Sequence, residues 1–152
     1  MSRLSRTTAQ AQLPAYLQNE APAIGLVHLG PGAFFRGHQA WYTHRAMQLA
    51  GGDWRICAVS MRSADVAAAL QPQDGLYYVA SMEQQTELEL VGSIAEVLVA
   101  PSQYGQVLAR LTAAQCRYVT MTITEKGYCL NGRGELDLTL PVVAADLALV
   151  EV

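Results

Sequence analysis

Two glycines separated by one residue lie where an expected strand turns into an expected helix. Gly30 and Gly32 follow the apolar run 24–29, and Pro31 stands between them. Backbone N–H groups at such a turn attract a phosphate, because they have no partner within the helix and the helix dipole adds positive charge. The first glycine makes the tight turn, and the second lets a pyrophosphate approach the backbone closely. The chemistry that this spacing could support is therefore anion binding.

Three neighbouring residues alter the usual fingerprint of this turn. Phe35 occupies the place of the third glycine, and Pro31 supplies no N–H donor. Arg36 stands just inside the expected helix, where its guanidinium can reach a phosphate. On the pattern alone, two interpretations stay open: a dinucleotide site, and a strand–turn–helix corner without a ligand.

A second candidate site follows the next expected strand, residues 56–61. In a dinucleotide fold, the residue at this strand end meets the adenosine ribose. Arg62, Ser63 and Asp65 follow here. An acid hydrogen-bonds to the ribose hydroxyls whereas an arginine favours a 2′-phosphate, so NAD is expected and NADP is not excluded. The same residues are equally typical of a solvent-facing helix start with Ser63 as its N-cap.

Threonines alternate along a third expected strand, residues 118–124, which we place in the centre of the sheet. Thr120, Thr122 and Thr124 share one face of this strand, and Glu125 follows them. Ligands of open α/β sheets bind at the carboxyl ends of the strands, so this row could line a wet crevice. The alternative is that threonine is simply a good strand former.

Composition and cysteine usage disfavour several other classes of function. Only 15% of the residues are charged, and the net charge of −3 disfavours a nucleic-acid partner. The three cysteines form no C-x-x-C pair, so we expect reduced thiols in a cytoplasmic protein and no zinc site. His38 and His44 are six residues apart and make a poor metal pair, and we expect His28 to be a buried core residue. No secretory signal or membrane span is expected.

The elements that must position these residues alternate between strands and helices. Apolar runs predict the strands, and glycine, proline and capping residues predict where helices begin and end. Segments 75–79 and 87–90 predict an antiparallel hairpin. The other expected elements are strands at 24–29, 56–61 and 118–124, an apolar stretch at 94–99, and helices at 36–50, 63–70 and 101–111. This order predicts an α/β fold with a doubly wound, mostly parallel, Rossmann-type sheet and a small antiparallel hairpin insertion.

The end of the chain predicts an interrupted domain. A helix is expected to begin near Val142, and it reaches the last residue without a glycine, an asparagine or a basic last turn to cap it. A stand-alone domain should end in a capped, polar helix, whereas a fragment would leave apolar surface exposed. That surface would lie around Leu140, Val143, Leu147 and Val150. We therefore expect residues 1–152 to form one dinucleotide-binding domain that is truncated.

Several segments, in order across residues 24–130, resemble the mannitol dehydrogenase family of long-chain polyol dehydrogenases, which includes fructuronate reductases and arabinitol dehydrogenases. The glycine turn is similar to the family pattern G-x-G-x-F-x-R-x-H-Q, in which a bulky residue also replaces the third glycine. The matching segments are His28–Gln39, Asp53–Trp54, Gln73–Tyr77, Gly92–Ile94 and Thr122–Tyr128.

The resemblance implies the N-terminal, NAD-binding domain of a larger, zinc-independent enzyme. Such enzymes interconvert a polyol or sugar acid and its keto form by hydride transfer. By this resemblance, the pyrophosphate would be held by Gly30, Gly32, Phe34 and Arg36. Asp65 or its neighbours, Arg62 among them, would meet the adenosine ribose, and Thr124 and Glu125 would lie near the nicotinamide.

The resemblance places the catalytic base outside this chain. In the family it is a lysine of a second, mostly helical domain, in the pattern K-x-x-x-x-N-x-x-H. The only lysine here, Lys126, is followed by Asn131 at the matching spacing, but Gly134 stands where the histidine would be. We therefore assign no catalytic residue, and we expect the catalytic helical domain to be absent and the polyol or sugar-acid substrate to bind through it.

Two rival interpretations stay open at this point. The chain could be a non-catalytic nucleotide-binding or interaction module derived from the family, or it could assemble with a separate chain that supplies the catalytic domain. These residues do not determine which polyol or sugar acid is the substrate, nor the oligomeric state.

Overall fold

The computed structural model describes residues 3–82 and 85–150, apart from the side chains of residues 125 and 126. It divides into two compact units, Met1–Thr122 and Ile123–Val152. The first unit holds the sheets and most of the helices. Among the described residues, no helix is both long and apolar enough to cross a membrane.

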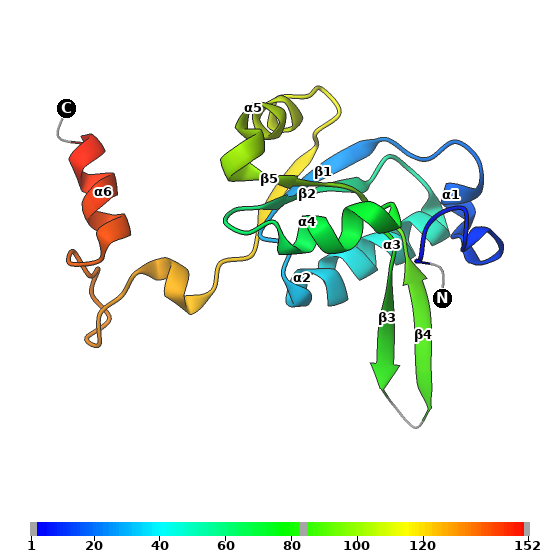
Figure 1. Cartoon of the computed structure of the whole chain (residues 1–152), viewed down its shortest axis with the longest axis horizontal. Coiled ribbons are helices and arrows are strands. Elements are labelled where there is room, and N and C mark those ends of the chain that lie inside the picture. The colour runs from blue at the N-terminus through cyan, green and yellow to red at the C-terminus, as the bar shows by residue number, and fades with distance from the viewer. Residues whose placement is uncertain (1–2, 83–84, 151–152) are drawn as a thin grey trace. The chain divides into compact units, whose positions relative to one another are not determined.

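The first unit is built on a parallel sheet with strand order β5-β2-β1-β6. Its strands are β1 (Ile24–Leu29), β2 (Arg55–Ser60), β5 (Ile94–Val99) and β6 (Tyr118–Met121). Its helices are α1 (Ala15–Gln18), α2 (Ala33–Gly37), α3 (Gln39–Ala50), α4 (Asp65–Leu70) and α5 (Ala100–Leu111), with single 3₁₀ turns η1 (Gln10–Gln12) and η2 (Gln71–Gln73). Figure 1 shows α5 on one side of this sheet and α2, α3 and α4 on the other.

Helices cover both faces because the strands are apolar at consecutive positions. In β1, Leu26 packs with α2, α3 and α4, while its neighbour Val27 packs in the cluster that includes Val107 of α5. In β2, all six residues are buried. Continuous apolar runs of this kind are typical of strands buried on both faces of a parallel sheet. The predicted doubly wound α/β fold is confirmed.

The hairpin insertion is also confirmed. β3 (Tyr77–Met82) pairs antiparallel with β4 (Thr86–Val91) as a separate two-stranded sheet. It projects from the body of the unit (Figure 1). Its base packs against the N-terminal segment through Leu76 and Leu90, which share a buried cluster with Leu13 and Leu17.

Three expectations about element boundaries are wrong. The helix expected at 36–50 is two helices, because the backbone leaves helical geometry at His38 (φ −122°, ψ −89°). Ser63 is not an N-cap: α4 begins at Asp65, whose carboxylate in the first turn complements the helix dipole. The strand expected at 118–124 ends at Met121 and lies at the edge of the sheet rather than in its centre.

The second unit contains η3 (Glu125–Tyr128) and α6 (Pro141–Val150). The expected helix near Val142 is confirmed and begins with Pro141, a residue favoured at the first helical position. Leu147 and Val150 are exposed as expected. The expectation for Val143 is wrong, because this side chain is 7% exposed.

Candidate functional site

The carboxyl edge of the parallel sheet gathers the predicted site residues of the first unit. The chain proceeds from β1 outward through β2 to β5, and then returns to the other side of β1 with β6. The order therefore reverses between β1 and β6, and open α/β sheets bind ligands outside the strand ends at such a reversal. Gly30, Met61 and Thr122 are the residues that directly follow β1, β2 and β6 at this edge.

Gly30 makes the tight turn with a backbone that favours glycine. Its φ is +90°, and a Cβ added there would lie 3.3 Å from the carbonyl oxygen of Thr122. Its N–H donates to the carbonyl oxygen of Val59 at 2.9 Å, which ties the turn to β2. Gly32 differs, because its backbone is extended and a Cβ there would meet no heavy atom within 4 Å. The first glycine is therefore required by the fold, and the second leaves open space above the turn.

The start of α2 presents backbone donors beside that open space. The N–H of Gly32 donates to the carbonyl oxygen of Gly30 at 2.8 Å. Within the described part of the chain, the next three N–H groups, of Ala33, Phe34 and Phe35, have no hydrogen-bond acceptor. Arg36 donates from Nη1 to the carbonyl oxygen of Pro31 at 2.6 Å, so its charge lies beside the turn. An open approach, unpaired donors and an adjacent cation together fit a pyrophosphate.

The two phenylalanines after the turn have different environments. Phe34 is 67% exposed, and its ring stacks on that of His38 with centroids 4.2 Å apart. Phe35 is buried and lies parallel to the ring of His28, with centroids 3.6 Å apart. The bulky residue at the third glycine position thus fills the space between α2 and the sheet, where a glycine would otherwise allow the helix to pack closer.

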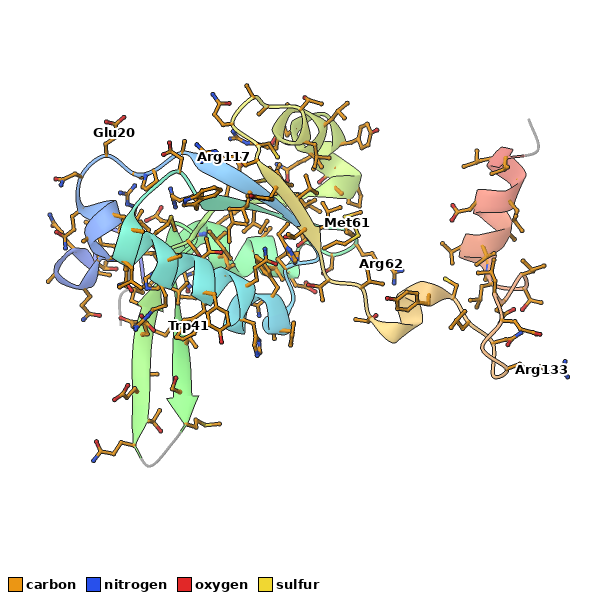
Figure 2. All side chains as sticks on the ribbon, turned by 180° about the vertical axis from the view of Figure 1, so that it is seen from behind. Glu20, Trp41, Met61, Arg62, Arg117 and Arg133 are labelled. Atoms are coloured by element: carbon orange, nitrogen blue, oxygen red, sulfur yellow. The ribbon has the colours of Figure 1, made fainter. Side chains whose placement is uncertain are left out.

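Arg62 and Asp65, the predicted ribose contacts, are both exposed after β2. Figure 2 shows Met61 and Arg62 at one edge of the sheet and Arg117, which precedes β6, at the other. Arg62 thus lies on the same edge as the glycine turn, and Asp65 follows it in the first turn of α4. No hydrogen bond joins either side chain to another described residue, so both are available to a ligand.

The predicted nicotinamide contacts belong to the second unit. Thr124 is exposed, and its carbonyl oxygen accepts a hydrogen bond from the N–H of Gly127 at 2.8 Å. The side chain of Glu125 lies outside the described residues. The structure therefore brings together the pyrophosphate and ribose candidates of the first unit, and it leaves the nicotinamide candidates as predictions.

A buried polar network beneath the turn was not foreseen from the sequence. His28 is 1% exposed, as expected of a core residue. Its Nδ1 lies 2.8 Å from Oγ1 of Thr120, and its Nε2 lies 3.1 Å from Oγ1 of Thr122. These two threonines therefore do more than form a strand, because their hydroxyls contact a buried imidazole. One signal was available: a histidine inside an apolar strand needs polar partners, and alternate threonines supply them.

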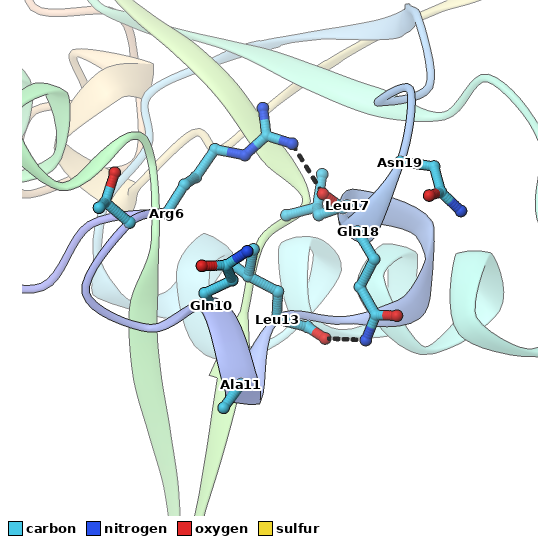
Figure 3. Close-up of a pocket in the computed structure, with 8 residues that line it drawn as sticks. Arg6, Gln10, Ala11, Leu13, Leu17, Gln18 and Asn19 are labelled. Carbon is cyan, nitrogen blue, oxygen red and sulfur yellow. Dashed lines mark hydrogen bonds between the residues drawn. The ribbon is translucent and has the colours of Figure 1, made fainter.

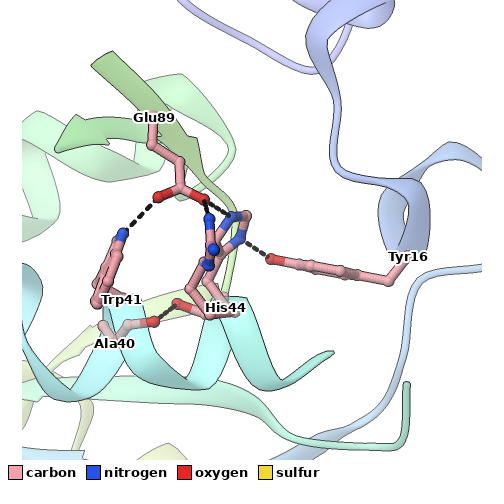
Figure 4. Close-up of polar contacts among 7 residues, drawn as sticks. Tyr16, Ala40, Trp41, His44 and Glu89 are labelled. Atoms are coloured by element: carbon pink, nitrogen blue, oxygen red, sulfur yellow. Dashed lines mark hydrogen bonds and ion pairs between the residues drawn. The ribbon is translucent and has the colours of Figure 1, made fainter. Parts of the chain in front are cut away.

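A second buried histidine joins three distant segments (Figure 4). His44 of α3 is fully buried, with Nδ1 2.6 Å from the hydroxyl of Tyr16 and Nε2 3.4 Å from Oε1 of Glu89. Trp41 and Arg45 donate to the same carboxylate at 2.6 and 3.1 Å. Although partial burial opposes ionisation, these two hydrogen bonds lower the pKa of Glu89. The network holds the N-terminal segment and the hairpin against α3.

A hollow of about 520 Å³ lies in the N-terminal segment, lined by Arg6, Thr7, Gln10, Ala11, Leu13, Leu17, Gln18 and Asn19. Figure 3 shows two of its polar side chains, Arg6 and Gln18, bonded to the backbone. Arg6 donates to the carbonyl oxygen of Leu17 at 2.8 Å, and Gln18 donates to that of Leu13 at 3.1 Å. Because these donors already serve the local fold, the hollow is a weaker candidate than the strand ends. The described residues contain no group of three or more His, Cys, Asp or Glu that could hold a metal ion.

Acidification from pH 7.5 to 5.5 is expected to destabilise the chain. Burial lowers the pKa of His28 and of His44 below the ordinary value of 6.5. The unfolded chain therefore binds more protons than the folded chain once the pH falls to about 6.5 and below, and the free energy of unfolding falls with it. Urea unfolding at both pH values measures this. A free energy of unfolding that is independent of pH would contradict the prediction.

Comparison with known proteins agrees with this description. A family model described as the mannitol dehydrogenase Rossmann domain matches residues 24–150. D-mannonate oxidoreductase of Escherichia coli K12 is 40% identical over 129 residues, which cover 80% of this chain and 26% of that protein. Mannitol 2-dehydrogenase of Phaeosphaeria nodorum is 36% identical over 97% of this chain and 26% of its own length. The chain thus spans about a quarter of the length of these relatives.

A solved structure extends the similarity to three dimensions. The mannitol 2-dehydrogenase of Pseudomonas fluorescens, in a ternary complex with NAD and D-mannitol, superimposes with a TM-score of 0.81 at 35% identity. The match covers 97% of this chain and 32% of that one. The match to the family model and the shared fold agree: this chain belongs to the mannitol dehydrogenase family and corresponds to its Rossmann domain.

Proposed function

We propose that this chain is the NAD-binding part of an oxidoreductase that interconverts a polyol or sugar acid and its keto form, of the mannitol/fructose or mannonate/fructuronate type. The observation that carries the proposal is the turn at Gly30–Gly32 at the strand-order reversal, with its open approach and three N–H groups that have no acceptor among the described residues. The names of the relatives support the same reaction class.

In this proposal each part of the cofactor has its own residues. The turn glycines and the first N–H groups of α2 hold the pyrophosphate, with Arg36 adding positive charge and Phe34 flanking it. When bound, the nicotinamide supplies the hydride chemistry, and the protein supplies position and charge. Thr124 and Glu125 are proposed on the nicotinamide side.

The proton-transferring group is proposed to lie outside these 152 residues. A general base must come within hydrogen-bond reach of the proton that it takes. Among the described side chains at the carboxyl edge we find Arg62, Asp65 and the threonines, whereas both histidines near the sheet are buried and bonded internally. The chain is thus proposed to hold half of an active site, and to bind cofactor without catalysing turnover alone.

Titration of the purified chain with NADH, followed by fluorescence, tests the proposal. We expect saturable binding, with NADPH binding about tenfold more weakly because the Asp65 carboxylate accepts ribose hydroxyls and repels a 2′-phosphate. Asp65→Ala should weaken NADH binding and narrow the difference between the two cofactors. Asp146→Ala, an exposed acid in α6, is the matched control and should change neither.

Two outcomes would contradict this proposal. No NADH binding by a folded chain at millimolar concentration would remove its basis. Reduction of fructose or fructuronate by the pure chain would contradict the half-site, since a base would then have to lie within the 152 residues. Equal affinity for both cofactors would contradict only the assignment of NAD.

A further inference from the structure

The carboxyl end of β1 holds an imidazole that contacts β6 and the residue just after it, beside the proposed cofactor site. His28 Nδ1 lies 2.8 Å from Oγ1 of Thr120, and Nε2 lies 3.1 Å from Oγ1 of Thr122. Nε2 also lies 3.3 Å from the carbonyl oxygen of Gly30, the first glycine of the turn. The ring is 1% exposed, so all its polar contacts are made within the protein.

The partners of the ring favour one of its two neutral tautomers. The hydroxyls of Thr120 and Thr122 can donate or accept, whereas the carbonyl oxygen of Gly30 can only accept, so its 3.3 Å contact favours the form in which Nε2 carries the hydrogen. Nδ1 is then an acceptor, and it receives the hydroxyl hydrogen of Thr120. Thr120 in turn accepts from Nε2 of Gln39 at 2.9 Å. The result is a one-way series of hydrogen bonds from Gln39 through Thr120 and His28 to the turn.

Contacts on the flat side of the ring fix its orientation. Phe35 stacks on His28 with an interplanar angle of 5° and a centroid distance of 3.6 Å. Burial lowers the pKa of His28, which keeps the ring neutral. The Gly30 carbonyl therefore receives two donors, the imidazole and the N–H of Gly32 at 2.8 Å. Both donors engage this carbonyl oxygen within the protein.

We propose that His28 is a positioning residue for the cofactor: its neutral Nε2–H form holds the Gly30 peptide, and Thr120 and Gln39 select that tautomer. The proposal rests on the proposed function, because it concerns the affinity of the same turn for a dinucleotide. His28 would set that affinity without contacting the cofactor, since a misdirected Gly30 carbonyl would present negative charge to the pyrophosphate.

The test compares variants that remove one hydroxyl each. Thr120→Val leaves Nδ1 without a donor at nearly unchanged volume, and we expect the Kd for NADH to rise about tenfold. Thr120→Ser keeps the hydroxyl and should restore the affinity.

Ser93→Ala is the control. It removes a buried hydrogen bond, from Oγ to the carbonyl oxygen of Ala40 at 2.7 Å, that does not involve the turn. It should lower the melting temperature without changing the Kd. Gln39→Leu provides a second test if Thr120→Val fails to fold.

Nitrogen-15 NMR of the His28 ring measures its tautomer directly. A purely structural role of Thr120 would leave that tautomer unchanged. We expect the neutral Nε2–H tautomer at pH 7 in the unaltered chain, and loss of that preference in Thr120→Val. An Nδ1–H tautomer or an imidazolium would overturn the proposal, as would a Kd that is unchanged in both Thr120→Val and Gln39→Leu. If the unaltered chain binds no NADH, the proposed function fails and the positioning role fails with it. If the unaltered chain binds NADH and the variants leave the Kd unchanged, only the positioning role of His28 is overturned.

Discussion

Gly32→Val is expected to abolish measurable NADH binding while leaving the fold intact. The valine side chain would enter open space, since a Cβ at this position meets no heavy atom within 4 Å. The extended backbone of Gly32 (φ −66°, ψ −178°) is also accessible to valine, so the free energy of unfolding should change by no more than about 1 kcal/mol. The same open space is where a pyrophosphate must approach the backbone, so we expect at least a ~100-fold loss of affinity.

Fluorescence titration with NADH and thermal unfolding of the same samples measure the two halves of this prediction. Gly105→Val is the matched control, because a Cβ at Gly105, within α5, also meets nothing within 4 Å. It should bind NADH like the parent chain. If Gly32→Val bound NADH as tightly as the parent chain, the pyrophosphate would not bind at this turn.

The opposite pattern is expected for Gly25→Ala, in which the added methyl group has no space. A Cβ at Gly25 would lie 2.1 Å from the carbonyl oxygen of Asp53, a backbone atom that cannot rotate away. The segment before β2 would have to move, and this would break two hydrogen bonds: from the N–H of Ala23 to Oδ1 of Asp53, and from the N–H of Arg55 to the Ala23 carbonyl oxygen. We expect a loss of about 3 kcal/mol in the free energy of unfolding.

Urea unfolding measures this loss, and Gly105→Ala is the control for the same one-carbon change. Because Gly105 is exposed within a helix, alanine there should stabilise the chain by about 0.5–1 kcal/mol. The two substitutions are therefore expected to have effects of opposite sign. A Gly25→Ala chain as stable as its parent would show that the segment before β2 can move without lowering the free energy of unfolding.

The sequence by itself determined the order of elements, since the signals for it are local. The run 24–29 is apolar at consecutive positions because its strand is covered on both faces, and that pattern needs no knowledge of the partners. Glu87 and Glu89 alternate with Leu88 and Leu90, which was sufficient to predict the hairpin. The turn at Gly30 could also be predicted, because a glycine directly follows the apolar run. The structure gives this residue a φ of +90°, which favours glycine.

Tertiary structure alone decided which side chains meet. Thr120 and His28 are 92 residues apart in the sequence, and only the pairing of β6 beside β1 brings their polar atoms within 2.8 Å. Tyr16, His44 and Glu89 likewise come from three separate elements. No sequence period encodes such contacts, because they depend on strand order and on the approach of helices to the sheet. The same holds for β6, which the sequence places in the centre of the sheet although the assembled sheet has it at an edge.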